Sequence, residues 1–422
     1  MKHNIWRLAL PAILQMSFQT SVGVITMILI GNFLAGAASV AAVGLAQRIM
    51  FLVIGTLVAL TVGTTALVAY NYGAGKKEEA GTVLFHSLII GVVAALVLGV
   101  FLDFCAPSLL GLLMLGNPDR EVIAMGSEYL TIVGYSMTFG IVLMIINAAL
   151  QGAGDMKRPM YFTIGMNIIT ILLGLILIPG YRFIPSLGLS GAAWAEGLSR
   201  GGAAIIAFIM LVKERFEVKL PVKKDWCWRP RVVKDILRIG LPSAGEQLVN
   251  QSSMIIYTAL VASLGTAAIA ANQVIMTVHS ISFMPGFGFG AAATTLVGQS
   301  LGAQKSDHAQ VYGVETNKMA AIFMGLMGMV FFIWSVPLSQ LFVPDQEVVH
   351  LASQCLRIVA FAQIPMSAVM VLSGGLRGAG DTRWVMYITM IGQWGLRMGL
   401  SVFAIWHGFG LAGVWVAMLM DM

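Results

Sequence analysis

The sequence predicts an all-α polytopic membrane protein of about 12 transmembrane helices in two pseudo-symmetric six-helix bundles. Of its 422 residues, 58% are hydrophobic and only 10% are charged, whereas soluble proteins carry about 45–50% apolar and about 25% charged residues. The apolar residues form long segments between short basic loops, and the second half of the chain repeats the first. These observations exclude an ordinary soluble enzyme and a disordered chain.

The individual helices follow from breaks at turn-forming or charged clusters. A helix needs about 20 apolar residues to cross a bilayer, and backbone groups in lipid must be hydrogen-bonded within the protein, which favours helices over shorter, alternating strands. The first six predicted helices lie near 8–34, 41–71, 80–103, 124–150, 160–179 and 189–212. The next six lie near 237–262, 268–299, 313–336, 349–375, 384–406 and 410–422. The twelfth helix looks truncated beside its counterpart in the first half.

Basic residues set the expected topology. Lysine and arginine gather before the first helix and in every even-numbered loop, while the alternate loops contain only Arg120 and Arg182. The positive-inside rule therefore predicts a cytoplasmic N-terminus for a multi-pass protein of a prokaryotic inner membrane. We expect a bundle over 1–212, a cytoplasmic linker over 213–236 and a second bundle over 237–422. The net charge of +6 then reflects topology, and no nucleic-acid partner is expected.

The internal repeat covers whole motifs. The string LQGAGDMKRPMY at 150–161 returns as LRGAGDTRWVMY at 376–387, and TTALVAYNYGAGKK at 64–77 returns as ATTLVGQSLGAQKS at 293–306. An even number of helices per half gives both halves the same orientation, a design typical of secondary transporters with the substrate path between the halves. The chain contains no nucleotide-binding P-loop motif. We therefore expect a transporter without enzymatic activity or a cofactor, driven by an ion gradient or by the substrate's own gradient.

These paired loops, together with the helix openings LALP at 8–11 and IGLP at 239–242, resemble the multidrug and toxic compound extrusion (MATE) family over essentially the whole chain. The resemblance implies two facing six-helix bundles and alternating access. It also implies export of small organic, often cationic and amphiphilic compounds in exchange for H⁺ or Na⁺. We expect a monomer in the bilayer. The wider superfamily contains flippases for lipid-linked saccharides or lipids, which are the alternative function.

Glu246 is the leading candidate for the coupling site, because an ionisable side chain inside a membrane bundle is costly and usually functional. It lies one turn after Pro242, and Asn250 follows one further turn along the same face. Competition of a proton or Na⁺ with a cationic substrate for this carboxylate would be antiport in its simplest form. The alternative is a carboxylate near the membrane interface or in a structural ion pair.

A polar network is predicted around this site. Arg397 and Gln393 face the same way in the eleventh helix, and Arg397 is expected to act on Glu246, or else to tether neighbouring helices. Trp394 is a weaker candidate for contact with substrate. Gln15 and Gln19 are the first-half counterparts of Glu246 and Asn250, and serve either as substrate ligands or as hydrogen-bonding links between helices.

Other positions depart from the family or suggest motion. Thr26 and Gly174 occupy first-half positions where many proton-coupled members carry aspartate, so the resemblance moves the coupling role to Glu246. Na⁺ binding at Glu246 and proton binding there both stay open. Pro285 and Gly286, within MPGFGFG, predict a kink or hinge in the eighth helix.

Overall fold

The computed structural model describes the chain except for residues 34–36, 115–118, 181–184 and 221–227. Its described residues are almost entirely helical and contain no strand. Nine of the described helices are long and apolar enough to cross a membrane. The predicted fold class is confirmed, and the helices begin and end within a few residues of most of the predicted breaks.

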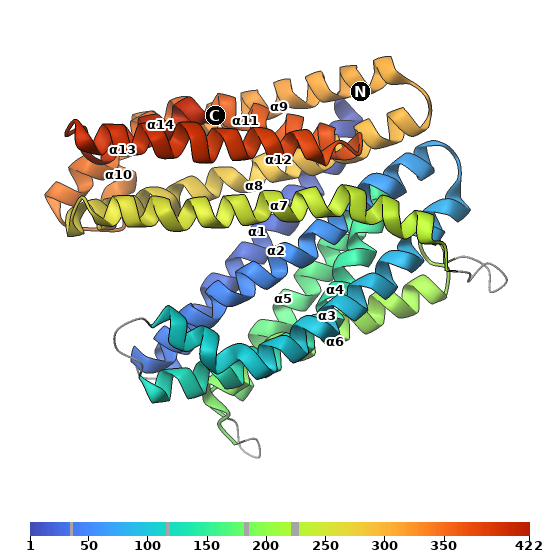
Figure 1. Ribbon diagram of the computed structural model, residues 1–422, viewed down its shortest axis with the longest axis horizontal. Coiled ribbons are helices and arrows are strands. Elements are labelled where there is room, and N and C mark those ends of the chain that lie inside the picture. The colour runs from blue at the N-terminus through green and yellow to red at the C-terminus, as the bar shows by residue number, and fades with distance from the viewer. Residues whose placement is uncertain (34–36, 115–118, 181–184, 221–227) are drawn as a thin grey trace. The chain divides into compact units, whose positions relative to one another are not determined.

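The chain forms two compact units. The first-half unit is Leu14–Gly240, and the second-half unit combines Met1–Ile13 with Leu241–Met422. Within each unit the long helices lie side by side (Figure 1). The helices of the first half are α1 (Lys2–Phe33), α2 (Ala37–Gly73), α3 (Lys77–Leu113), α4 (Arg120–Gly152), α5 (Lys157–Leu177) and α6 (Gly188–Val212).

The second half repeats this order with one short addition. Its helices are α7 (Pro230–Ala262), α8 (Thr266–Gly302), α9 (Ser306–Ile333), α10 (Ser335–Gln340), α11 (Gln346–Gly378), α12 (Thr382–Met390), α13 (Met398–Trp406) and α14 (Gly410–Asp421). A π-helix, Ile391–Arg397, joins α12 to α13 in one continuous span. The apolar pattern did not predict α10, because this helix has only six residues. It did not predict the π-helix either, because length and hydropathy do not distinguish one helix type from another.

The start of the chain packs on the second half. The Trp6 ring meets the rings of Phe289 and Phe323 edge-on, at centroid distances of 5.5 and 6.5 Å. The polar stretch after α6 packs on the first half instead. Lys77 at the start of α3 holds Glu217 at 3.2 Å and thereby lowers the pKa of that carboxyl.

The repeated G-A-G-D motif is a helix C-cap. Gly154 and Gly380 have φ of 90° and 80°, a left-handed conformation that glycine adopts at little cost. In each loop the aspartate N–H donates to the carbonyl of the residue five positions earlier, at 2.9 Å in both halves. This bond belongs to the left-handed cap that commonly ends helices, and it explains why the motif occurs twice.

Close backbone contacts repeat as well. Thr294 Oγ1 in α8 donates to the Gly374 carbonyl in α11 at 2.8 Å, and Thr65 Oγ1 in α2 donates to the Ala148 carbonyl in α4 at 3.2 Å. A Cβ on Gly378 would collide with the Thr294 backbone, as one on Gly152 would with the Thr65 carbonyl. Small residues thus let one helix pair in each half pack backbone to backbone.

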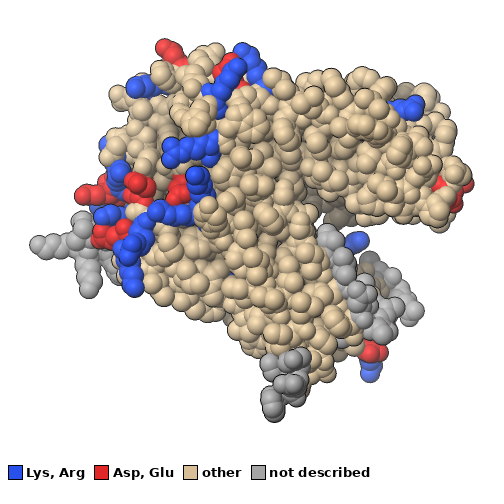
Figure 2. Space-filling model, turned by 180° about the vertical axis from the view of Figure 1, so that it is seen from behind, with Lys and Arg blue, Asp and Glu red and all other residues tan. Residues whose placement is uncertain are grey.

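Apolar side chains also cover much of the outside. On the face drawn in Figure 2, charged side chains gather in patches and leave broad uncharged areas between them. Exposed large residues include Phe104, Leu341 and Trp406. Surface of this kind is suited to contact with lipid.

Candidate functional site

Glu246 and Arg377 form a largely buried ion pair in the second-half unit. The Glu246 Oε1 atom accepts a hydrogen bond from Arg377 Nη2 at 2.5 Å, and the two side chains are 8% and 26% exposed. Glu246 Oε2 and Arg377 Nε are buried without a hydrogen-bond partner among the described residues. Removing one member of such a pair typically costs about 3–5 kcal/mol, because the other charge is left buried and unpaired.

The contact places Glu246 along its bundle. Arg377 lies in the last turn of α11, and Gly245 packs against Met386, in the first five residues of the span Thr382–Trp406. Glu246 is therefore level with the helix ends that flank the loop after α11, rather than with the middle of those helices. Glu246 is thus held in an ion pair, which was one of the two alternatives to a coupling role.

The first half has the same contact without charge. Gln151 Nε2 donates to Gln15 Oε1 at 3.4 Å, and in the repeat Gln15 matches Glu246 and Gln151 matches Arg377. From the sequence alone, Arg377 counted only as one of the basic loop residues that set the topology. The motif pair LQGAGD and LRGAGD contained the signal, since the only change before the shared GAGD replaces a glutamine with an arginine.

A second repeated link joins the first helix of each half to the fifth. Asn250 Oδ1 in α7 accepts a hydrogen bond from Gln393 Nε2 in the π-helix. At the matching place, Asn167 Nδ2 in α5 donates to the Phe18 carbonyl in α1 at 2.8 Å. The predicted residues Asn250 and Gln393 are thus in contact, one helical turn from Glu246.

Arg397 pairs with Asp421 in α14 and not with Glu246, a contact of the kind described by the alternative of a tether between neighbouring helices. Its Nη2 and Nε atoms donate to Asp421 Oδ2 in α14, at 2.6 and 3.0 Å. The two side chains are 15% and 8% exposed. The physical reason is position, because Arg397 lies one turn beyond Gln393, and Gln393 already contacts Asn250, one turn beyond Glu246. The sequence reasoning missed Asp421 because the last helix was regarded as cut short.

The Arg397–Asp421 pair also has a neutral counterpart. The hydroxyls of Thr170 in α5 and Ser199 in α6 lie 2.5 Å apart, and Ser199 matches Asp421 in the repeat. Gly392 in the π-helix leaves space for the Asp421 carboxylate, which a Cβ there would meet.

The remaining predicted residues are described within their own units. Gln19 is exposed on the first-half unit, and Trp394 is exposed on the second-half unit. Pro285 and Gly286 are buried within α8, which continues through them without interruption. Gly286 packs tightly against the Met370 sulfur.

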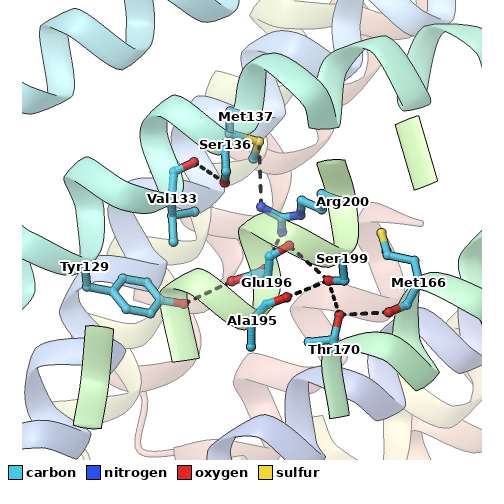
Figure 3. A network of polar contacts seen from close by, with 10 residues as sticks. All are labelled: Tyr129, Val133, Ser136, Met137, Met166, Thr170, Ala195, Glu196, Ser199 and Arg200. Atoms are coloured by element: carbon cyan, nitrogen blue, oxygen red, sulfur yellow. Dashed lines mark hydrogen bonds and ion pairs between the residues drawn. The ribbon is translucent and has the colours of Figure 1, made fainter. Parts of the chain in front are cut away.

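A charged network lies inside the first half. Glu196 and Arg200 form an ion pair one turn apart in α6. Tyr129 in α4 donates to Glu196 Oε2 at 3.1 Å, and Figure 3 shows Tyr129 and Arg200 pointing at Glu196. The contacts of Glu196 and Arg200 among the described residues lie within the first half, so this network links α4 to α6.

The described residues contain no group of three or more His, Cys, Asp or Glu side chains that could hold a metal ion.

Two homologous helical halves, each with polar links inside a membrane-spanning bundle, are typical of membrane transporters. The sequence model of the MatE family matches residues 11–176 and 242–403, which lie in both halves. The chain therefore belongs to the MatE family, whose members are transporters and not enzymes. The predicted resemblance is confirmed.

Similar proteins support this assignment. The chain is 30% identical to a Thermotoga maritima protein named "Probable multidrug resistance protein NorM", over 100% of this chain and 89% of that protein. It is 29% identical to "Uncharacterized transporter YisQ" of Bacillus subtilis, over 91% of this chain and 84% of the other. A crystal structure of MATE in the bent conformation shares the fold, with a TM-score of 0.92 and 24% identity over 100% of this chain and 92% of that one.

Proposed function

We propose that the protein is a secondary antiporter that exports organic, often cationic and amphiphilic compounds in exchange for H⁺ or Na⁺ by alternating access. It acts as a monomer in a prokaryotic inner membrane, with its N-terminus in the cytoplasm. Membership of the family and the names of its relatives support this substrate class. The observation that carries the coupling mechanism is the buried carboxylate of Glu246, which has one oxygen on Arg377 and the other without a partner among the described residues.

In this mechanism Glu246 holds one cation at a time. A proton, Na⁺ or a cationic substrate that binds the carboxylate must replace the charge that neutralises it, since a buried charge without a partner is strongly unfavourable. The occupancy of one carboxylate thus couples the inward movement of the ion to the outward movement of the substrate. Asn250, held by Gln393, supplies a nearby amide oxygen.

Efflux from inverted vesicles tests this function. Ethidium efflux is measured under a proton gradient alone and then under a sodium gradient alone, with Glu246→Gln beside the wild type. We expect the variant to abolish gradient-driven efflux while the protein still inserts. The double variant Glu246→Gln/Arg377→Gln copies the neutral Gln15–Gln151 contact and guards against a folding defect caused by an unpaired arginine.

Glu196→Gln is the matched control, because it makes the same chemical change in another arginine-paired carboxylate. It is expected to keep its response to the gradient. Undiminished efflux by a Glu246→Gln protein would refute the mechanism. Binding of a lipid pyrophosphate without any response to cationic dyes would instead support the lipid-linked saccharide flippase.

A further inference from the structure

We propose that Arg377 is a tethered competitor of the transported cation: its guanidinium and the incoming ion occupy Glu246 alternately. This inference rests on the proposed function and adds a positioning residue to it. Arg377 would define the resting state of the site and the ion concentration needed to leave that state.

The geometry makes the two occupants exclusive. Arg377 Nη2 lies 2.5 Å from Glu246 Oε1, and the Glu246 side chain is buried among its neighbours. A carboxylate in this position cannot remain charged without a cation. Glu246 Oε2 has no partner among the described residues, and it is the oxygen at which an incoming proton or Na⁺ would replace the guanidinium.

Arg377 can leave more easily than Glu246 can. It lies in the last turn of α11, and its side chain is about three times as exposed as that of Glu246. A long basic side chain can extend from a helix end toward water, and the carbonyl groups of that end favour a positive charge. Gly378 fixes the backbone beside it, because the helix end packs directly on the Thr294 backbone in α8. Exchange at Glu246 therefore requires a movement of the arginine side chain or of α7, and not of the end of α11.

The first half has the same contact between helices, but without a charged side chain that could compete with a cation. Gln15 and Gln151 connect the equivalent helices at 3.4 Å, and neither side chain carries a charge. A glutamine at position 377 is thus a substitution that this protein already uses at the matching place. We infer that the charged version serves to regulate occupancy, since an amide pair provides the helix contact alone.

The test compares Arg377→Gln and Arg377→Lys with the wild type in liposomes. Ethidium transport is measured while the driving cation is varied, as a Na⁺ series at fixed pH and a pH series without Na⁺. For the cation that drives the wild type, Arg377→Gln should lower the half-saturating concentration about 10-fold, equal to about 1.4 kcal/mol. Arg377→Lys keeps a competing charge and should stay within about threefold of the wild type, a smaller shift than the tenfold one.

Arg383→Gln is the matched control, because it removes one positive charge from the same loop region, at the beginning of α12. It should leave the half-saturating concentration unchanged. Arg377→Met, with an unbranched side chain and no charge, replaces Arg377→Gln if that protein fails to insert. The unfolding temperature of every variant is measured in parallel.

An unchanged or raised half-saturating concentration in the uncharged variants would overturn the inference. A purely structural pair would lower the unfolding temperature without shifting the cation dependence. If Glu246→Gln keeps its gradient-driven efflux, the proposed function itself fails. If Glu246→Gln is inactive and the Arg377 variants keep the wild-type cation dependence, only the present inference fails.

Discussion

Replacing Gly378 by alanine tests whether α8 and α11 form the fixed support of Arg377. A Cβ at this position would lie 2.9 Å from both the Cα and the carbonyl carbon of Thr294, and closer still to its carbonyl oxygen. All three atoms belong to the backbone, so no side chain can rotate away. The helices would have to separate, and overpacking of this kind costs about 1–3 kcal/mol.

Two smaller effects adjust that magnitude. Separation would weaken the hydrogen bond from Thr294 Oγ1 to the Gly374 carbonyl, which contributes about 1 kcal/mol. Alanine gains up to about 1 kcal/mol over glycine in helix propensity. These terms nearly cancel, and Gly378→Ala should destabilise the protein by about 1–3 kcal/mol.

Gly375→Ala provides the control three residues earlier in the same helix. Its Cβ would meet only the Val297 Cγ2 atom, at the ordinary contact distance of 3.8 Å. The propensity gain should therefore survive, and this variant should be as stable as the wild type or more stable by up to about 1 kcal/mol.

The assay is the apparent unfolding temperature of the purified proteins in detergent, compared at one heating rate because unfolding of such proteins is often irreversible. We expect the order Gly375→Ala, wild type, Gly378→Ala from highest to lowest. Ethidium efflux should fall in Gly378→Ala, since the shift displaces the neighbouring Arg377. A Gly378→Ala protein that unfolds at or above the temperature of Gly375→Ala would refute the reasoning.

Two further outcomes are expected. Asp421→Asn should lower the unfolding temperature strongly, because it leaves the Arg397 charge buried without its counter-ion at a cost of about 3–5 kcal/mol. The double variant Arg397→Thr/Asp421→Ser, which copies the Thr170–Ser199 contact, should unfold at a higher temperature than Asp421→Asn, and the reverse order would contradict this explanation. A membrane-impermeant thiol reagent added outside intact cells should not label Cys227, which lies outside the described residues; labelling would reverse the proposed orientation.

The helices were predictable from the sequence, but most long-range partners were not. Helix length and hydropathy act locally, so the predicted spans needed no tertiary information. Helical periodicity identifies neighbours on one helix face, as for Glu196 and Arg200, but it cannot find the partner of Glu246, which is 131 residues away. The positive-inside rule was also misleading at Arg377, because a basic residue at a helix end can both mark topology and neutralise a buried carboxylate.

The two halves share a set of contacts but differ in charge. The first helix meets the fourth through Gln15–Gln151 in one half and Glu246–Arg377 in the other, and the fifth helix meets the sixth through Thr170–Ser199 and Arg397–Asp421. An amide or hydroxyl pair and an ion pair can hold helices at similar distances, but only the ion pair responds to an added cation. The first half therefore holds its matching helices without a charge at either contact. At these two contacts only the second half carries charge, which supports our proposal that ion dependence resides there.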